Sequence, residues 1–155
     1  MTISNEYHAK PTNIDAGLLV LRVGVGSALM LIHGWQKLTN TAAFLIAGRS
    51  WGFVDFVHRL GFPFPALFAT CAALGESICA LSVLCGLFTR PASLAAALTM
   101  LVAMYGSVES GTPVEAAYLY ALPFVTLALT GAGEFSFDRL IRESAALRYL
   151  HALSR

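Results

Sequence analysis

Two charged side chains, Arg22 and Glu76, interrupt stretches of sequence that are otherwise apolar. Residues 16–36 surround the arginine and residues 66–88 surround the glutamate, and each stretch is long enough to cross a bilayer. A charge at the centre of a bilayer costs about 2.5–3.5 kcal/mol on insertion scales. Each charge therefore requires a partner, a water-filled cavity or a function. We predict that the two form an ion pair between the two segments.

Further polar residues lie on the same side of the first segment as Arg22. At about 100° per residue, His33 and Lys37 fall within a stripe about 80° wide that also holds the arginine. Polar groups on one face of a spanning helix point towards the protein interior, because lipid does not solvate them. The stripe predicts a polar cavity that runs from mid-membrane to the outer interface. His33, Trp35 and Lys37 are its candidate ligand-binding residues.

Each of these residues also has a structural interpretation. A buried Arg22–Glu76 pair suits either the fixing of helix register or a polar site for a quinone, a redox intermediate or a proton. His33 is a candidate proton carrier or hydrogen-bond partner of a quinone, or an interfacial histidine with no special role. Lys37 suits a side chain that extends to the lipid headgroups, and Trp35 suits the aromatic belt of a membrane surface.

The three cysteines, Cys71, Cys79 and Cys85, all lie in the second apolar segment and include no C-x-x-C pair. Cys71 and Cys79 are about 12 Å apart along one helix, which is too far for a disulfide. The spacing favours small apolar filler. The sequence offers no metal-ligand cluster, phosphate-binding loop or Ser-His-Asp arrangement, so it assigns no catalytic residue.

The composition indicates a membrane protein. Of the 155 residues, 57% are hydrophobic and 12% are charged, whereas about 25% are charged in an ordinary soluble domain. The mean hydropathy is +0.68. The chain lacks the polar residues that would cover a soluble surface, so we expect it to contact membrane lipid. Its net charge of +1 gives no electrostatic footprint for nucleic acid.

Four apolar segments predict four spanning helices, at about 16–36, 66–88, 92–109 and 114–132. The long connection 38–63 is rich in aromatic residues and predicts a short amphipathic helix that lies on the bilayer. The tail, 134–155, mixes arginines with apolar residues and predicts a juxtamembrane amphipathic helix. The expected fold is one all-α domain, 1–155: an integral membrane four-helix bundle with these two additions.

The basic residues predict the orientation in the membrane. Four spans place both termini on one side, together with six lysines or arginines, while the other side holds Lys37, Arg49 and Arg59. The positive-inside rule then places both termini in the cytoplasm. The polar residues 1–15 include acids and do not fit a signal peptide.

Several motifs, in their order and spacing, resemble the DoxX family of small four-helix membrane proteins. They are Arg22, HGWQKL at 33–38, FVDFVHRLGFPFP at 53–65, GES at 75–77, CGLFTRPASL at 85–94 and GAGEFSFDRL at 131–140. The resemblance covers about 14–142. Arg22 and Glu76 match recurrent polar positions of the family, and Gly34 with Lys37 matches its G-x-x-K element.

The resemblance implies a bacterial inner-membrane protein associated with redox metabolism. Name-giving members of the family are similar to quinone-reducing subunits of a thiosulfate-oxidising complex, and others belong to membrane oxidoreductase complexes. It therefore implies a subunit of a quinone-linked system, with a quinone as cofactor and an oxidoreductase as partner. Two alternatives stay open: a non-catalytic scaffold that anchors a partner oxidoreductase, and a protein that handles a small molecule or a lipid. Whether the chain is itself an enzyme also stays open.

Overall fold

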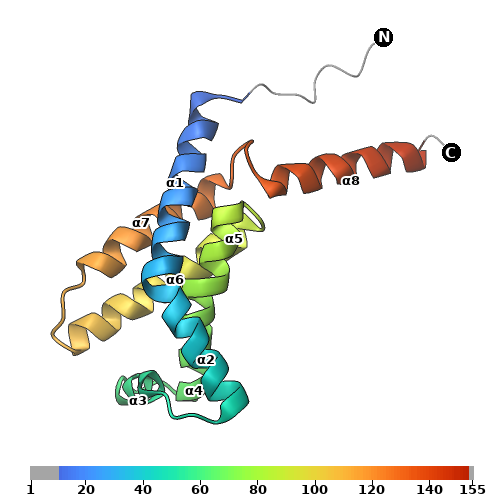
Figure 1. Cartoon of the computed structure of the whole chain (residues 1–155). Coiled ribbons are helices and arrows are strands. Elements are labelled where there is room, and N and C mark those ends of the chain that lie inside the picture. Colours follow the sequence, from blue (N-terminus) through green and yellow to red (C-terminus); the bar gives the residue numbers. More distant parts are fainter. Residues whose placement is uncertain (1–10, 154–155) are drawn as a thin grey trace.

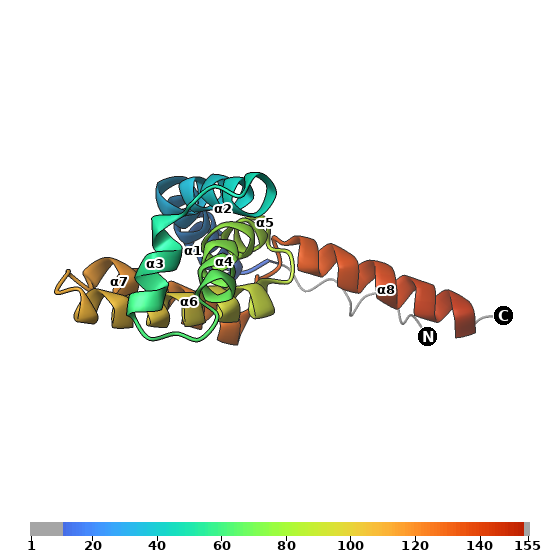
Figure 2. The ribbon, with the colours of Figure 1, turned by 90° about the horizontal axis from the view of Figure 1, so that it is seen from below.

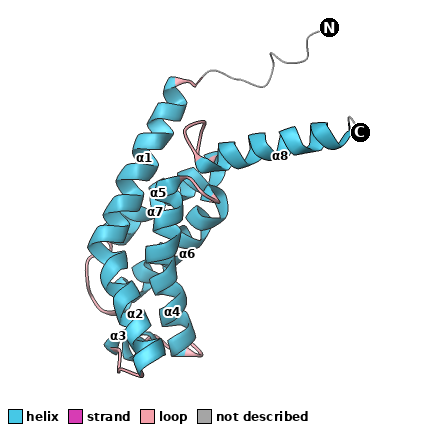
Figure 3. Ribbon diagram, turned by 45° about the vertical axis from the view of Figure 1, so that its right-hand side comes forward, coloured by secondary structure: helices cyan, strands magenta, loops and turns pink. Residues whose placement is uncertain are grey.

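A computed structural model describes the backbone of residues 11–153 and the side chains of residues 11–145. All regular elements in that range are helical (Figures 1 and 3), which confirms the predicted all-α class. In chain order they are α1 (Asn13–Leu29), η2 (Met30–Gly34), α2 (Trp35–Ala47), α3 (Gly52–Arg59), α4 (Pro65–Leu74), η3 (Gly75–Cys79), α5 (Ala80–Cys85), α6 (Thr89–Glu109), α7 (Glu115–Thr130) and α8 (Phe137–Leu153).

Three of the described helices are long and apolar enough to cross a membrane: Asn13–Ala47, Pro65–Cys85 and Thr89–Glu109. The fourth predicted span corresponds to α7, which is apolar but has 16 residues. The protein is therefore a membrane protein with several apolar helices. Its predicted segments agree with helices of the structure except at the end of the first.

The first span continues well beyond its predicted end. α1, η2 and α2 form one helix of 35 residues, Asn13–Ala47, whereas the apolar segment had predicted an end at about residue 36. No glycine or proline occurs between Gly34 and Gly48, so nothing in the backbone stops the helix there. It ends at Gly48, whose φ of 62° is a left-handed conformation that glycine adopts without strain. Lys37 therefore lies inside this helix.

Glycines on the first helix fix its register against α4–η3–α5. A Cβ on Gly26 would lie 2.9 Å from the Ala80 carbonyl oxygen, and a Cβ on Gly34 would overlap the Glu76 carbonyl oxygen. Small residues allow two helix backbones to come this close. Because position 26 faces position 80 and position 34 faces position 76, the two helices run antiparallel.

The two π-helical segments, η2 and η3, meet at this contact between Gly34 and Glu76. A π-helical turn contains one more residue than an α-helical turn, and such turns are frequent at functional sites. Both interruptions of regular α-helix therefore lie at one level of the fold, where the buried Glu76 is found.

α6 and α7 form a hairpin whose core consists of buried side chains shared with the first helix and α5. The largest of these are Leu29, Val83, Met100, Phe124 and Leu127. Figures 1 and 2 show that the hairpin crosses the first helix obliquely. α6 contacts η3 and α5, and it then diverges from α4 towards the end of the molecule that carries α3 (Figure 1).

The region between α6 and α4 is closed at one end by α3, the helix expected within 38–63. Trp51 and Val57 are buried against Ala69 and Ala73 of α4, and several phenylalanines pack around them. This cluster holds α3 across the end of the fold. At the opposite end, α8 projects away from the other helices (Figure 2).

Candidate functional site

Glu76 forms an ion pair with Lys37. The Lys37 Nζ atom lies 2.5 Å from Glu76 Oε1, and the two side chains are 27% and 5% exposed. The same ammonium lies 4.7 Å from the ring centroid of Phe53, within the range of a cation–π contact. A buried carboxylate requires such a partner, because an unpaired charge in an apolar region is strongly destabilising. The pair explains how Glu76 is tolerated in an apolar helix.

The ion pair lines a cavity of about 700 Å³ between α3, α4–η3 and α6. Its walls are mainly apolar and include four phenylalanines: Phe53, Phe56, Phe62 and Phe68. The neutral polar groups are fewer and include Thr99 and Ser107. Binding sites for small molecules usually have volumes of about 300–1,000 Å³, apolar walls and a few placed polar groups. The cavity has this size and composition.

The predicted Arg22–Glu76 ion pair is wrong. The Arg22 guanidinium donates hydrogen bonds to the backbone carbonyls of Ala132, at 3.0 Å, and Phe135. A Cβ on Gly86 would overlap this guanidinium, so Arg22 lies beside Gly86. At about 1.5 Å per residue, Gly86 is some 15 Å further along its helix than Glu76. The glycine-defined register thus separates two buried charges that were predicted to pair.

Arg22 belongs to a junction that holds the segment after α7. Besides the two carbonyls bound by Arg22, the Asp15 carboxylate accepts a hydrogen bond of 3.0 Å from the Glu134 N–H. Arg139 forms ion pairs with Glu134 and Glu143, at 2.8 and 2.7 Å. The hydrogen bond to Glu143 raises the pKa of Arg139 above its usual value. These contacts tie the segment 131–136 to the first helix.

Asp138 connects the same segment to the start of α6. Its carboxylate accepts hydrogen bonds from the N–H groups of Phe88, at 2.6 Å, and Thr89, at 2.9 Å. A carboxylate at this position satisfies the free N–H groups of a helix start and complements its dipole. The motifs at 85–94 and 131–140 therefore meet in one structural junction, and no residue of this junction lines the cavity.

The DoxX family profile matches residues 17–107, which is more than half of the chain. The chain belongs to the DoxX family. The matched range includes both members of the Lys37–Glu76 pair and most of the cavity lining, and it ends before the motif at 131–140. No curated protein and no solved structure matches the chain.

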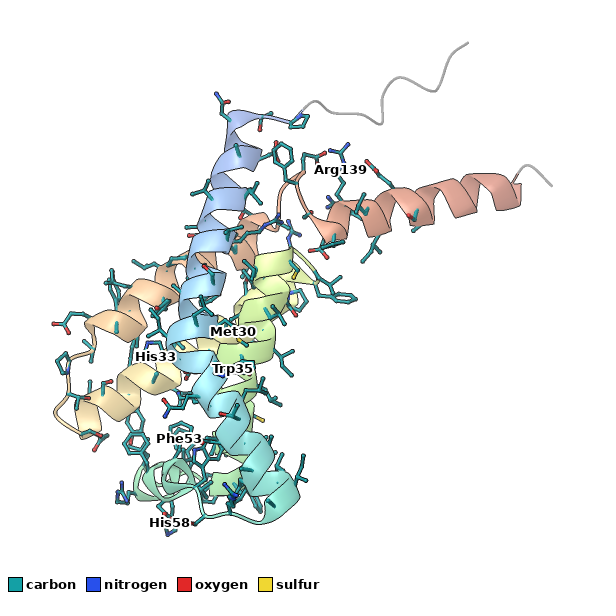
Figure 4. All side chains as sticks on the ribbon, viewed as in Figure 1. Met30, His33, Trp35, Phe53, His58 and Arg139 are labelled. Atoms are coloured by element: carbon teal, nitrogen blue, oxygen red, sulfur yellow. The ribbon has the colours of Figure 1, made fainter. Side chains whose placement is uncertain are left out.

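The remaining predicted site residues lie outside the cavity of this DoxX protein. The His33 ring makes an edge-to-face contact with Tyr120 of α7, with 5.8 Å between centroids. Trp35 is 61% exposed. Figure 4 shows the two side chains on different sides of the first helix. Of the five predicted site residues, Lys37 and Glu76 are brought together at the cavity, whereas Arg22, His33 and Trp35 do not line it.

Other residues that line the cavity were not predicted from the sequence as site residues. The phenylalanines of 53–62 were expected in an amphipathic helix that lies on the bilayer, and Thr99 carried no signal. Cys71 and Cys79 also line the cavity, whereas Cys85 does not. All three cysteines are free thiols. The described residues contain no group of side chains that could hold a metal ion. A usable signal was the absence of glycine and proline between Gly34 and Gly48, because a helix that continues to Gly48 contains Lys37.

Proposed function

We propose that this DoxX protein binds a quinone in the cavity between α3, α4–η3 and α6, as a membrane subunit of a quinone-linked oxidoreductase system. The observation that supports this function is the pair between the half-buried Lys37 and the buried Glu76 in an otherwise apolar cavity. A quinone has a flat ring that packs well against aromatic side chains. It also has carbonyl oxygens that accept hydrogen bonds, and Lys37 offers a donor with three N–H bonds.

The residues that line the cavity offer both apolar contacts for the ring and hydrogen-bonding groups for the carbonyl oxygens of a quinone. The quinone carries the electrons, which a partner oxidoreductase supplies, while the protein binds and orients it. Phe53 and Phe56 hold the ring from the side of α3. Lys37 donates a hydrogen bond to one carbonyl oxygen, and the Glu76 carboxylate next to it holds or releases a proton.

Quinone titration of the protein in lipid nanodiscs tests this function. We expect saturable binding by the wild type. Glu76→Gln and Lys37→Gln should each weaken binding about tenfold or more, because a charge-assisted hydrogen bond in a buried site is worth about 1.5–3 kcal/mol. Glu115→Gln, the same exchange at an exposed position of α7, is the control and should bind like the wild type. Folding of each variant is checked by circular dichroism.

Absence of binding by the folded wild type would refute the proposal, as would normal binding by both site variants. A scaffold for a partner oxidoreductase is the second candidate, and the projecting α8 favours it, because Phe137, Leu140 and Ile141 are exposed there. A scaffold tolerates Glu76→Gln and instead loses its partner on Ile141→Ser. A protein that handles a small molecule or a lipid would move its ligand across liposomes without any redox partner.

We further propose that the chain lies in a bacterial inner membrane with both termini in the cytoplasm, and that α7 is its fourth span. In support, the start of α1 and the start of α8 lie at one end of the molecule and α3 lies at the other (Figure 1). α3 would then lie at the outer surface of the bilayer. Labelling of Ser50→Cys and Ser144→Cys from each side of sealed vesicles tests this orientation.

A further inference from the structure

We infer that the ligand of the cavity is a molecule dissolved in the bilayer that carries a long apolar chain, and that it enters sideways between α4 and α6. This inference rests on the proposed function and specifies the class of quinone. A molecule that came from water would instead need an opening at the loops.

The rim of the cavity consists of exposed apolar residues on two long helices. Phe68, Cys71 and Leu74 line the cavity from α4, and Leu98 and Val102 line it from α6. All five are exposed. Their spacings of three and four residues place them on one face of each helix. Both helices belong to segments long and apolar enough to cross a membrane, so this rim faces lipid.

The end of the cavity next to the loops is narrowed by contact between α3 and α6. A Cβ on Gly106 would lie 3.2 Å from Phe56 Cζ and 3.3 Å from Leu60 Cδ1. A methyl group at this position would already press against α3, so the contact between α3 and α6 is tight here. The residues beyond it are polar, Ser110 and Thr112. The side towards lipid is therefore the more apolar of the two.

The positions of the ion pair and the rim determine which parts of the ligand are polar and which are apolar. Lys37 and Glu76 attract the polar head of a ligand to the inner wall, because they are the charged groups that line the cavity. Any part of the molecule that extends past Leu98 and Val102 meets acyl chains and must itself be apolar. A headgroup with a prenyl or alkyl chain satisfies both conditions, and a small quinone that is polar throughout satisfies only the first.

A tryptophan on the rim tests this portal. Leu98→Trp places a large ring in the opening, and Leu101→Trp is the matched control: the two leucines are 55% and 53% exposed on the same helix, but Leu101 does not line the cavity. Val102→Trp is a second rim variant if the first does not fold. The probes are a dimethoxy-methyl-benzoquinone with a decyl chain and the same headgroup without a chain, each titrated into nanodiscs.

We expect the rim substitutions to affect only the quinone that carries the decyl chain. Rim variants should weaken binding of the decyl compound about tenfold or more and leave the headgroup compound within about twofold of the wild type, while Leu101→Trp changes neither. If the wild type binds both compounds and the rim variants bind the decyl compound like the control, the portal is refuted and quinone binding stands. If Thr112→Trp alone weakens binding of the decyl compound, the decyl chain leaves the cavity at the loops and the portal is refuted. If the wild type binds neither compound, the proposed function itself fails.

Discussion

Replacement of Lys37 by methionine removes the charge that faces Glu76 while keeping most of the side-chain volume. Removal of one partner from a fully buried ion pair costs about 3–5 kcal/mol, because the other charge is left unpaired. Exposed pairs contribute about 0–1 kcal/mol. Since the Glu76 side chain is 5% exposed and that of Lys37 is 27% exposed, this pair lies nearer the buried limit. We expect Lys37→Met to lower the free energy of unfolding by about 2–4 kcal/mol.

The double variant Lys37→Met/Glu76→Leu separates an unpaired charge from lost van der Waals contacts. With both charges removed, most of the destabilisation should disappear, because two apolar side chains often replace a buried pair without loss. Unfolding in mixed micelles with increasing SDS, followed by circular dichroism, measures all variants. Arg49→Met is the control, because this arginine is exposed in the loop after α2. The reasoning is refuted if Lys37→Met is no less stable than the control, or if the double variant is less stable than either single variant.

Three other substitutions examine contacts at the site and at the junction that holds the segment after α7. Gly34→Ala should destabilise the protein by about 2 kcal/mol or more, because its methyl group would overlap the Glu76 carbonyl, whereas Gly24→Ala, with nothing within 4 Å, should be neutral or stabilising in the same unfolding assay; equal effects would contradict the glycine-defined register. Arg22→Lys keeps the charge but loses the guanidinium fork, so hydrogen exchange of 131–136 should accelerate while quinone binding stays within about twofold; weakened binding would place Arg22 in the site after all. Asp138→Ala should cost about 0.5–2 kcal/mol through loss of the α6 cap, and Asp55→Ala on the exposed face of α3 should cost less; a result within experimental error of zero for Asp138→Ala would show that the cap is not needed.

Local sequence patterns were enough to predict the helices. Long apolar runs bounded by glycine and proline mark Pro65–Cys85 and Thr89–Glu109 to within a few residues. The end of the first helix was missed because it was set where the apolar run ends, although no helix-breaking residue occurs before Gly48. That one boundary assigned Lys37 to the membrane surface, although the lysine lies within the helix and pairs with Glu76.

The partner of Glu76 was not predictable from residue depth along each helix. Depth leaves an offset between Arg22 and Glu76 that a long arginine side chain can bridge, but the register depends on where the glycines of one helix meet the other helix. Such contacts join residues far apart in the chain and leave no local pattern. The same holds for the phenylalanines of α3, whose composition suits either a membrane interface or a cavity wall.

A photoreactive quinone that is cross-linked to the protein in nanodiscs and mapped by mass spectrometry gives the most direct test of the site. We predict cross-links to α4–η3 and α6, in peptides that contain Cys71, Cys79 and Thr99, and competition by unlabelled quinone. A second apolar groove, between α1 and α7, is lined by Leu21 and Tyr120 and offers the alternative location. Cross-links confined to α1 and α7, or cross-links that unlabelled quinone does not reduce, would contradict a quinone site at the Lys37–Glu76 pair.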